Sequence, residues 1–215
     1  MKKTTVICVL KLGGDFSSIY VRKLQNAVKR HLNMPYEFVC LTDDASIDFC
    51  KTIPLVNNWK GWWSKIEVFR AGLVNTDRIV YFDLDTVILQ DINILVQQDY
   101  DFIALQSFNP QKRKNPYLIG SGIMSWRNNW AFNFLYDQFN TEMCFGRFRG
   151  DQDYIGSQLI RKGKKFKHWQ ALINGIYSYK RNCKKGIPKD AKIVCFHGRP
   201  RPCNAKEKWV KENWI

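Results

Sequence analysis

The stretch from Ile79 to Leu89, IVYFDLDTVIL, decides the fold, because it places two carboxylates, Asp83 and Asp85, inside the most apolar run of the chain. β-Branched and aromatic residues precede Asp83 and apolar residues follow Asp85, so the segment is predicted to be a buried strand that ends at the aspartates. Ionised groups this close to a core are costly unless a positive charge meets them. Alternation along an extended backbone places both carboxylates on one side, where they could share a hard divalent cation.

The sequence around this stretch alternates between strand and helix patterns. Strands are predicted at 4–10, 36–41, 53–56, 102–106, 118–126 and 192–196. Helices are predicted at 18–32, over about ten residues from Ser64, and at 91–99, 129–139 and 154–162. With 215 residues, of which 45% are hydrophobic, the chain suffices for one packed core. We therefore predict an α/β fold in a single domain, 1–215, with a mostly parallel central sheet flanked by helices.

Composition limits the cellular compartment and the kinds of partner expected for this chain. Seven scattered cysteines without a CxxC pair favour reduced thiols in a cytoplasm-like compartment. The first residues lack a signal-peptide cleavage site, and no apolar run reaches the roughly 18 residues of a membrane span. A net charge of +15 suits a polyanionic partner, either nucleic acid, an anionic membrane surface or a phosphate-bearing substrate. The expected location is cytoplasmic, with peripheral contact at the inner membrane surface as an option.

A third metal ligand and several cations follow from the positions of the strands. His197 comes directly after the apolar run IVCF, and side chains at strand ends usually form the sites of open α/β sheets. Mn²⁺ or Mg²⁺ would then be held by Asp83, Asp85 and His197, with Mn²⁺ favoured by the mixed oxygen and nitrogen donors. Arg199 and Arg201 are candidates to grip a diphosphate, and the lysine of GWWSK, Lys65, is another phosphate contact.

Four motifs in this order resemble glycosyltransferase family 8 and its GT-A-fold relatives. They are YFDLDTVIL, the Ser-Gly strand LIGSGIMSW, the Asp-Gln helix start GDQDYI, and IVCFHGRPRP. The resemblance covers nearly the whole chain, and it implies a Rossmann-like GT-A fold. It also implies a metal-dependent transferase that moves a hexose from a nucleotide-diphosphate sugar, usually a UDP-sugar, with retention of configuration. The acceptor is left open, with an anionic glycan and a lipid-linked sugar among the candidates.

The resemblance assigns roles to individual positions. Asp151 and Gln152 would lie near the reacting carbon, with Asp151 acting either as nucleophile or in orienting the acceptor. The positions implied for nucleotide-sugar binding are Leu10, Asp43, Lys65, Leu84, Ser121, Gly122, Gly198, Arg199 and Arg201. Family members commonly carry Asn-Ser-Gly where this chain has Gly120-Ser121-Gly122, and Lys-Pro-Trp where it has Arg201-Pro202-Cys203.

Two other classes of function compete with this interpretation. A haloacid-dehalogenase-like phosphatase would use Asp83 as nucleophile and Asp85 as acid/base, but its motif normally opens the domain, whereas strands precede it here. A nucleic-acid-binding module would explain the charge, although no known binding motif contains the basic runs at 112–114, 161–167 and 180–185. Salt-sensitive, metal-independent binding to oligonucleotides would favour that module.

Overall fold

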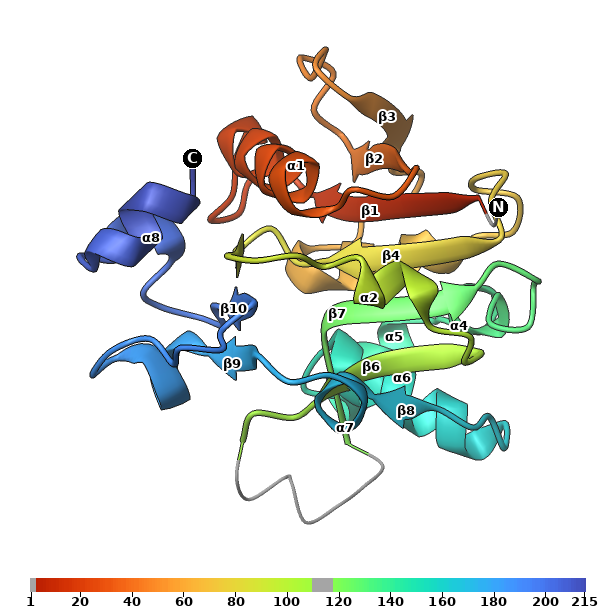
Figure 1. Ribbon diagram of the computed structural model, residues 1–215. Helices are drawn as coiled ribbons and strands as arrows, with labels where there is room; N and C mark the ends of the chain where they lie inside the picture. Colours follow the sequence, from red (N-terminus) through yellow and green to blue (C-terminus); the bar gives the residue numbers. More distant parts are fainter. Residues whose placement is uncertain (1–2, 110–117) are drawn as a thin grey trace.

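A twisted seven-stranded sheet with helices on both faces dominates the computed structural model, which describes residues 3–109 and 118–215 (Figure 1). The strand order is β3-β2-β1-β4-β7-β6-β8. The strands are β1 (Thr4–Leu10), β2 (Glu37–Thr42), β3 (Lys51–Pro54), β4 (Arg78–Phe82), β6 (Phe102–Gln106), β7 (Ile119–Arg127) and β8 (Lys167–His168). Strand β7 runs antiparallel to its neighbours β4 and β6, and the other neighbouring pairs are parallel. The mostly parallel sheet expected from the sequence is confirmed.

The central strands β1 and β4 are apolar on both faces, which is why they lie in the middle of the sheet. Along β1, Cys8 belongs to one core and Ile7 to the other, because successive side chains point to opposite faces. Along β4, Phe82 and Tyr81 divide in the same way. Each face of the sheet therefore has its own hydrophobic core, and both cores are built on the same two strands.

Helices of unequal length cover these cores. Helix α1 (Ser18–His31) packs with residues at helical spacing, and its buried side chains are Tyr20, Val21, Leu24, Ala27 and Val28. The 3₁₀ helix η1 (Gly61–Phe69) lies over the other core, as does α6 (Asp151–Arg161). The shorter helices are α2 (Ile94–Gln97), α4 (Phe134–Asp137), α5 (Thr141–Arg147), α7 (Trp169–Leu172) and α8 (Lys208–Asn213).

A second, smaller sheet lies beside the first in the order β5-β10-β9 (Figure 1). Its strands are β5 (Thr86–Ile88), β9 (Ile176–Ser178) and β10 (Ile193–Cys195). Strand β10 runs antiparallel to β5, with Cys195 opposite Thr86, and parallel to β9. A short π-helix, η2 (Tyr179–Cys183), follows β9, and a 3₁₀ turn, η3 (Pro202–Asn204), follows β10. This small sheet ties the segment after Asp85 to a late part of the chain.

The C-terminal residues pack back onto the fold. Trp214 is buried, and its ring lies 4.8 Å from that of Tyr20 on α1. Lys23 on the same helix donates a hydrogen bond to the carbonyl of Trp214 at 3.0 Å. Within 3–109 and 118–215, none of the helices has the length and apolarity needed to cross a membrane.

Three predictions of local structure need correction. The strand before Asp83 ends at Phe82, as predicted, but the backbone does not stay extended through Asp85: it turns at Asp83, and the Thr86 amide donates to the Asp83 carbonyl at 3.2 Å. The helix predicted from Ser64 is a 3₁₀ helix that begins at Gly61, and the helix predicted at 129–139 is confined to Phe134–Asp137. Helix α5 was not predicted, and the basic run at 112–114 lies outside the described residues.

Candidate active site

A cleft of about 1020 Å³ opens where several strands end. It is lined by loop residues after β1 (Lys11 to Phe16), after β4 (Asp83 to Thr86) and after β6 (Ser107 to Asn109). Residues of η1, β7, α6 and η2 and the segment after β10 complete the walls. The carboxyl ends of parallel strands are where open α/β sheets bind ligands, so the cleft lies where this fold places its sites.

Most of the residues predicted for the site come together in this cleft. Those that line it are Lys65, Asp83, Leu84, Asp85, Ser121, Gly122, Asp151, Gln152, His197, Gly198 and Arg201. They come from distant parts of the sequence, yet all face one volume. The four motifs of the sequence therefore form one site.

Leu10, Asp43 and Arg199 do not line the cleft. Leu10 is fully buried in the core under α1, and its neighbours Val9 and Lys11 line the cleft in its place. Asp43 accepts hydrogen bonds from the Lys11 ammonium and, at 2.8 Å, from the Leu12 amide, so it positions the loop after β1. The base pocket expected from Leu10, the loop after it and Asp43 stays a prediction, with Val9 and Lys11 as the residues of β1 and its loop that face the cleft.

The two aspartates lie in a tight turn that is held from both sides. The Asp83 amide donates to the carbonyl of Gly122 on β7 at 2.8 Å, and the Phe196 amide donates to the Asp85 carbonyl at 3.1 Å. The Asp85 side chain is 5% exposed and that of Asp83 is 34% exposed. Burial, together with the nearby charge of Asp83, raises the pKa of Asp85 to about 7, although Arg201 opposes that rise.

A buried lysine connects the first aspartate to the start of α6. The Lys65 ammonium lies 2.9 Å from the carboxylates of both Asp83 and Asp151, and it donates to the Ser121 hydroxyl at 3.0 Å. The Ser121 hydroxyl in turn donates to Asp151 at 2.5 Å. Burial alone would lower the pKa of Lys65, but Asp151 and Asp83 raise it above its usual value. Lys65 is therefore charged and bridges the side chains of Asp83 and Asp151.

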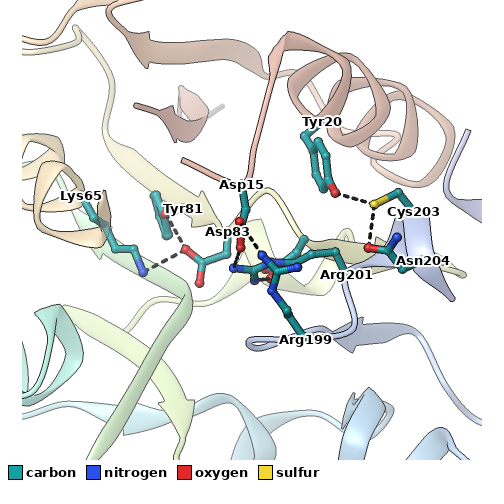
Figure 2. Close-up of polar contacts among 10 residues, drawn as sticks. Asp15, Tyr20, Lys65, Tyr81, Asp83, Arg199, Arg201, Cys203 and Asn204 are labelled. Carbon is teal, nitrogen blue, oxygen red and sulfur yellow. Dashed lines mark hydrogen bonds and ion pairs between the residues drawn. The ribbon is translucent and has the colours of Figure 1, made fainter. Parts of the chain in front are cut away.

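Figure 2 shows Lys65 and Tyr81 converging on the Asp83 carboxylate. The Tyr81 hydroxyl donates to it at 2.6 Å. Burial and the Asp83 carboxylate raise the pKa of Tyr81 well above its usual value, so the phenol stays a donor. One oxygen of Asp83 is thus occupied, and the other lies near Gly122, where an added Cβ would approach it to 3.2 Å.

Two arginines of the C-terminal segment, Arg199 and Arg201, contact Asp15 in the loop after β1 (Figure 2), and Arg201 alone also contacts Asp85. Arg201 donates to Asp85 at 2.5 Å and to Asp15 at 3.2 Å, and its guanidinium lies 4.5 Å from the centre of the Phe16 ring. Arg199 contacts Asp15 at 3.0 Å while its side chain is 79% exposed. Arg201 is therefore a cleft residue, as predicted, whereas Arg199 lies at the rim, outside the lining.

His197 lines the same cleft, just after strand β10 of the small sheet. Its Nε2 atom lies 2.7 Å from the Ser178 hydroxyl, and its ring is parallel to that of Phe108 at 5.8 Å. Burial lowers the pKa of His197, and the charges of Lys180 and Arg181 lower it further. The imidazole is thus neutral near pH 7, as a metal ligand must be.

The predicted metal ligands share one cleft but form no preassembled cluster. Among residues 3–109 and 118–215, no three His, Cys, Asp or Glu side chains are grouped to hold a metal ion. Asp85 is bound to Arg201, and His197 is bound to Ser178. The chemistry of the set still fits Mn²⁺ or Mg²⁺, because two mutually repelling carboxylates and a neutral imidazole are suitable donors.

Several cleft residues escaped the sequence reasoning. Lys180, Arg181 and Lys184 line the cleft, although they stood out in the sequence only as part of a basic run. Asp15 follows the Gly13-Gly14 turn with no local signal of a site. Trp62 lines the cleft with 58% of its surface exposed, whereas the neighbouring Trp63 is buried. The only sequence signal for this exposed indole was the concentration of tryptophans between Trp59 and Trp63.

Comparisons with solved structures identify the fold. The glycosyltransferase GlyE of Streptococcus pneumoniae TIGR4 matches with a TM-score of 0.68 and 14% identity over 100% of this chain and 62% of that one. Its apo form matches with a TM-score of 0.65, 14% identity and coverages of 99% and 61%. The galactosyltransferase LgtC, solved in complex with donor and acceptor sugar analogs, matches with a TM-score of 0.67, 10% identity and coverages of 97% and 96%.

The chain is an α/β protein with a cleft at the ends of its strands. More specifically, it has the GT-A-type fold that GlyE and LgtC share. The fold class predicted from the sequence is confirmed. The chain spans 62% of the length of GlyE and nearly all of LgtC. The sequence itself matches no family model and no curated protein.

Proposed function

We propose that this protein is a glycosyltransferase that uses a nucleotide-diphosphate sugar, with a UDP-sugar as the preferred donor. The observation that carries the proposal is the convergence of the aspartate turn, the Ser-Gly strand, the start of α6 and His197 on one cleft of a GT-A-type fold. The solved LgtC complex with donor and acceptor sugar analogs supports a sugar-transfer role for this architecture.

Asp83, Asp85 and His197 are proposed to hold Mn²⁺ or Mg²⁺ together with the donor diphosphate. Such an ion acts as a Lewis acid that stabilises charge on the departing diphosphate. To serve as a metal ligand, Asp85 would have to give up its contact with Arg201, and the guanidinium could then contact phosphate oxygens by forked hydrogen bonds. Asp15 can retain Arg201 near the cleft during this exchange, because it binds the other guanidinium nitrogen.

Asp151 is proposed to face the reacting carbon, with Gln152 beside it on the cleft wall. Contacts with Lys65 and Ser121 fix the orientation of its carboxyl group. A preorganised negative charge stabilises the positive charge that develops at a sugar carbon as the diphosphate leaves. The same position suits either a nucleophile or an acceptor-orienting role, and transfer with retention is proposed for both.

The donor proposal predicts a ligand-specific gain in thermal stability. Because a ligand that binds only the folded state raises its stability, UDP or a UDP-sugar with Mn²⁺ should raise the unfolding midpoint, and EDTA should abolish that shift. Thermal-shift measurements with UDP, GDP and their sugars would test this and identify the base. Absence of a shift with any nucleotide, together with stabilisation by Mg²⁺ and a phosphate mimic, would favour the phosphatase.

The position of Asp83 argues against the phosphatase alternative. One oxygen of Asp83 already accepts from Tyr81 and contacts Lys65, and the turn follows the fourth strand of the chain. The nucleic-acid alternative loses support because Lys180, Arg181 and Lys184 line the cleft beside His197, where a polymer has less access than on an open surface. Every observation that favours either alternative is also explained by the transferase proposal.

A glycine beside the aspartate turn gives a sharp test of the metal site. In Gly122→Ala, the added Cβ would lie 3.2 Å from an Asp83 oxygen and displace the carboxylate. We expect Mn²⁺-dependent UDP affinity to fall roughly 10- to 100-fold, since small misplacements of a binding group have effects of this size. Gly146→Ala is the control, because nothing lies within 4 Å of its added Cβ. Equal UDP affinities in the two variants, measured by calorimetry, would count against Asp83 as a ligand.

A further inference from the structure

Three cations from one short segment line the cleft on the His197 side. Lys180 and Arg181 belong to η2, and Lys184 follows it directly. Lys180 is half-buried, whereas Arg181 and Lys184 are exposed. Lys180 approaches Gly198 so closely that a Cβ added there would lie 3.0 Å from the ammonium nitrogen. The glycine after His197 therefore leaves room for this lysine.

The segment that carries these cations is anchored on both of its flanks. The Tyr179 ring stacks on Phe196 at 4.2 Å, and its hydroxyl donates to Glu207 at 2.6 Å. Ser178 accepts from the Arg181 amide at 3.4 Å, and Cys183 is fully buried. The backbone of the three cations is thus fixed by packing, so little ordering is needed when they meet a ligand.

These cations differ from the others in the cleft because no acid neutralises them. Lys65 and Arg201 are each shared between two carboxylates, and Lys11 is paired with Asp43. Within the parts of the chain that the structure describes, Lys180, Arg181 and Lys184 form no ion pair with a carboxylate. Three fixed, uncompensated charges in a cleft raise the local concentration of anions.

We propose that Lys180, Arg181 and Lys184 form an anion site for a phosphate or carboxylate group carried by the acceptor, which makes the acceptor an acidic molecule. This inference rests on the proposed transferase function. The donor diphosphate is assigned to the aspartate turn, where Lys65 contacts Asp83 and Arg201 contacts Asp85, whereas no ion pair among the described residues joins the three cations to either aspartate. The acidic acceptor also accounts for part of the net charge of +15.

The test uses inorganic phosphate as a probe on the whole chain. Phosphate at ten times its dissociation constant should raise the unfolding midpoint by roughly 3 to 6 °C. The triple variant Lys180→Gln, Arg181→Gln, Lys184→Gln should lose at least about tenfold in phosphate affinity by calorimetry, because its charge-assisted hydrogen bonds are removed. Lys185→Gln is the matched control, since Lys185 is exposed beside Lys184 but does not line the cleft.

A second arm separates the acceptor from the donor. With the donor position saturated by UDP and Mg²⁺, phosphate should still bind, and the triple variant should still bind UDP. Loss of phosphate binding in the presence of UDP would assign the cations to the donor diphosphate and overturn the acceptor site. Equal phosphate affinity in the triple variant and in Lys185→Gln would overturn the anion site itself. If phosphate binds but no nucleotide does, the proposed transferase function is wrong, and the proposal of an acidic acceptor is wrong with it.

Discussion

Replacing Lys65 with methionine will lower the free energy of unfolding by about 3 to 5 kcal/mol, the cost of breaking a buried ion pair from one side. The Lys65 side chain is 7% exposed and neutralises both Asp83 and Asp151. Without it, the buried side chain of Asp151 and the partly exposed side chain of Asp83 have no cation between them. Chemical denaturation monitored by circular dichroism measures the loss directly, and donor binding should be lost as well because Asp83 is no longer oriented.

Two further variants separate the effect of the lost charge in Lys65→Met from the effect of altered packing. Lys60→Met, at the exposed residue before η1, should change stability by no more than about 0.5 kcal/mol. Adding Asp151→Asn to Lys65→Met should restore part of the loss, since one of the uncompensated charges is then removed. A loss below about 1 kcal/mol in Lys65→Met would show that the network is not a structural element.

In Asp85→Asn, Mn²⁺-dependent binding of UDP should disappear while the protein stays folded. The change keeps the size of the side chain and removes the charge that a cation needs, and Arg201 keeps its ion pair with Asp15. Transfer, if assayed, should fall on the order of a thousandfold or more, because Lewis-acid stabilisation is worth several kcal/mol and each 1.36 kcal/mol is tenfold in rate. Calorimetry with UDP, with and without Mn²⁺, gives the binding result.

Asp48→Asn is the matched control for Asp85→Asn, because Asp48 is an exposed aspartate outside the cleft. It should bind UDP with Mn²⁺ as the unmodified chain does. His197→Ala should resemble Asp85→Asn, although its loss of the Ser178 contact alters the small sheet as well. Full metal-dependent UDP affinity in Asp85→Asn would refute the assignment of the aspartate turn as the metal site.

The sequence was sufficient for the main strands because their signal is local. Thr4–Leu10 and Phe102–Gln106 were predicted with their observed bounds, since runs of buried β-branched and aromatic residues leave little alternative. The helical segments were less predictable. The segment from Gly61 has good apolar content, but it winds as a 3₁₀ helix so that Trp63 and Lys65 both turn inward.

The site could be predicted only in part, because motifs indicate candidate residues but not which of them are in contact. Asp83, Asp85 and His197 were predicted from their positions at strand ends, and Asp151 from the family resemblance; all four line the cleft. The contact of Asp15 with Arg199 joins positions 184 residues apart, and no local pattern contains it. Leu10 does not line the cleft, because the alternation of β1 turns its side chain into the core and its neighbours toward the cleft.

The pairing of β5 with β10 also has a consequence for the order in which the molecule is made. Asp85 and its partner Arg201 are 116 residues apart in the sequence, so at cellular rates of synthesis the aspartate turn leaves the ribosome on the order of ten seconds before its arginine. For most of that interval, His197 and the strand β10 that precedes it have not yet been synthesised. A nascent chain therefore has half a cleft, and the residues that complete it are added only near the end of synthesis.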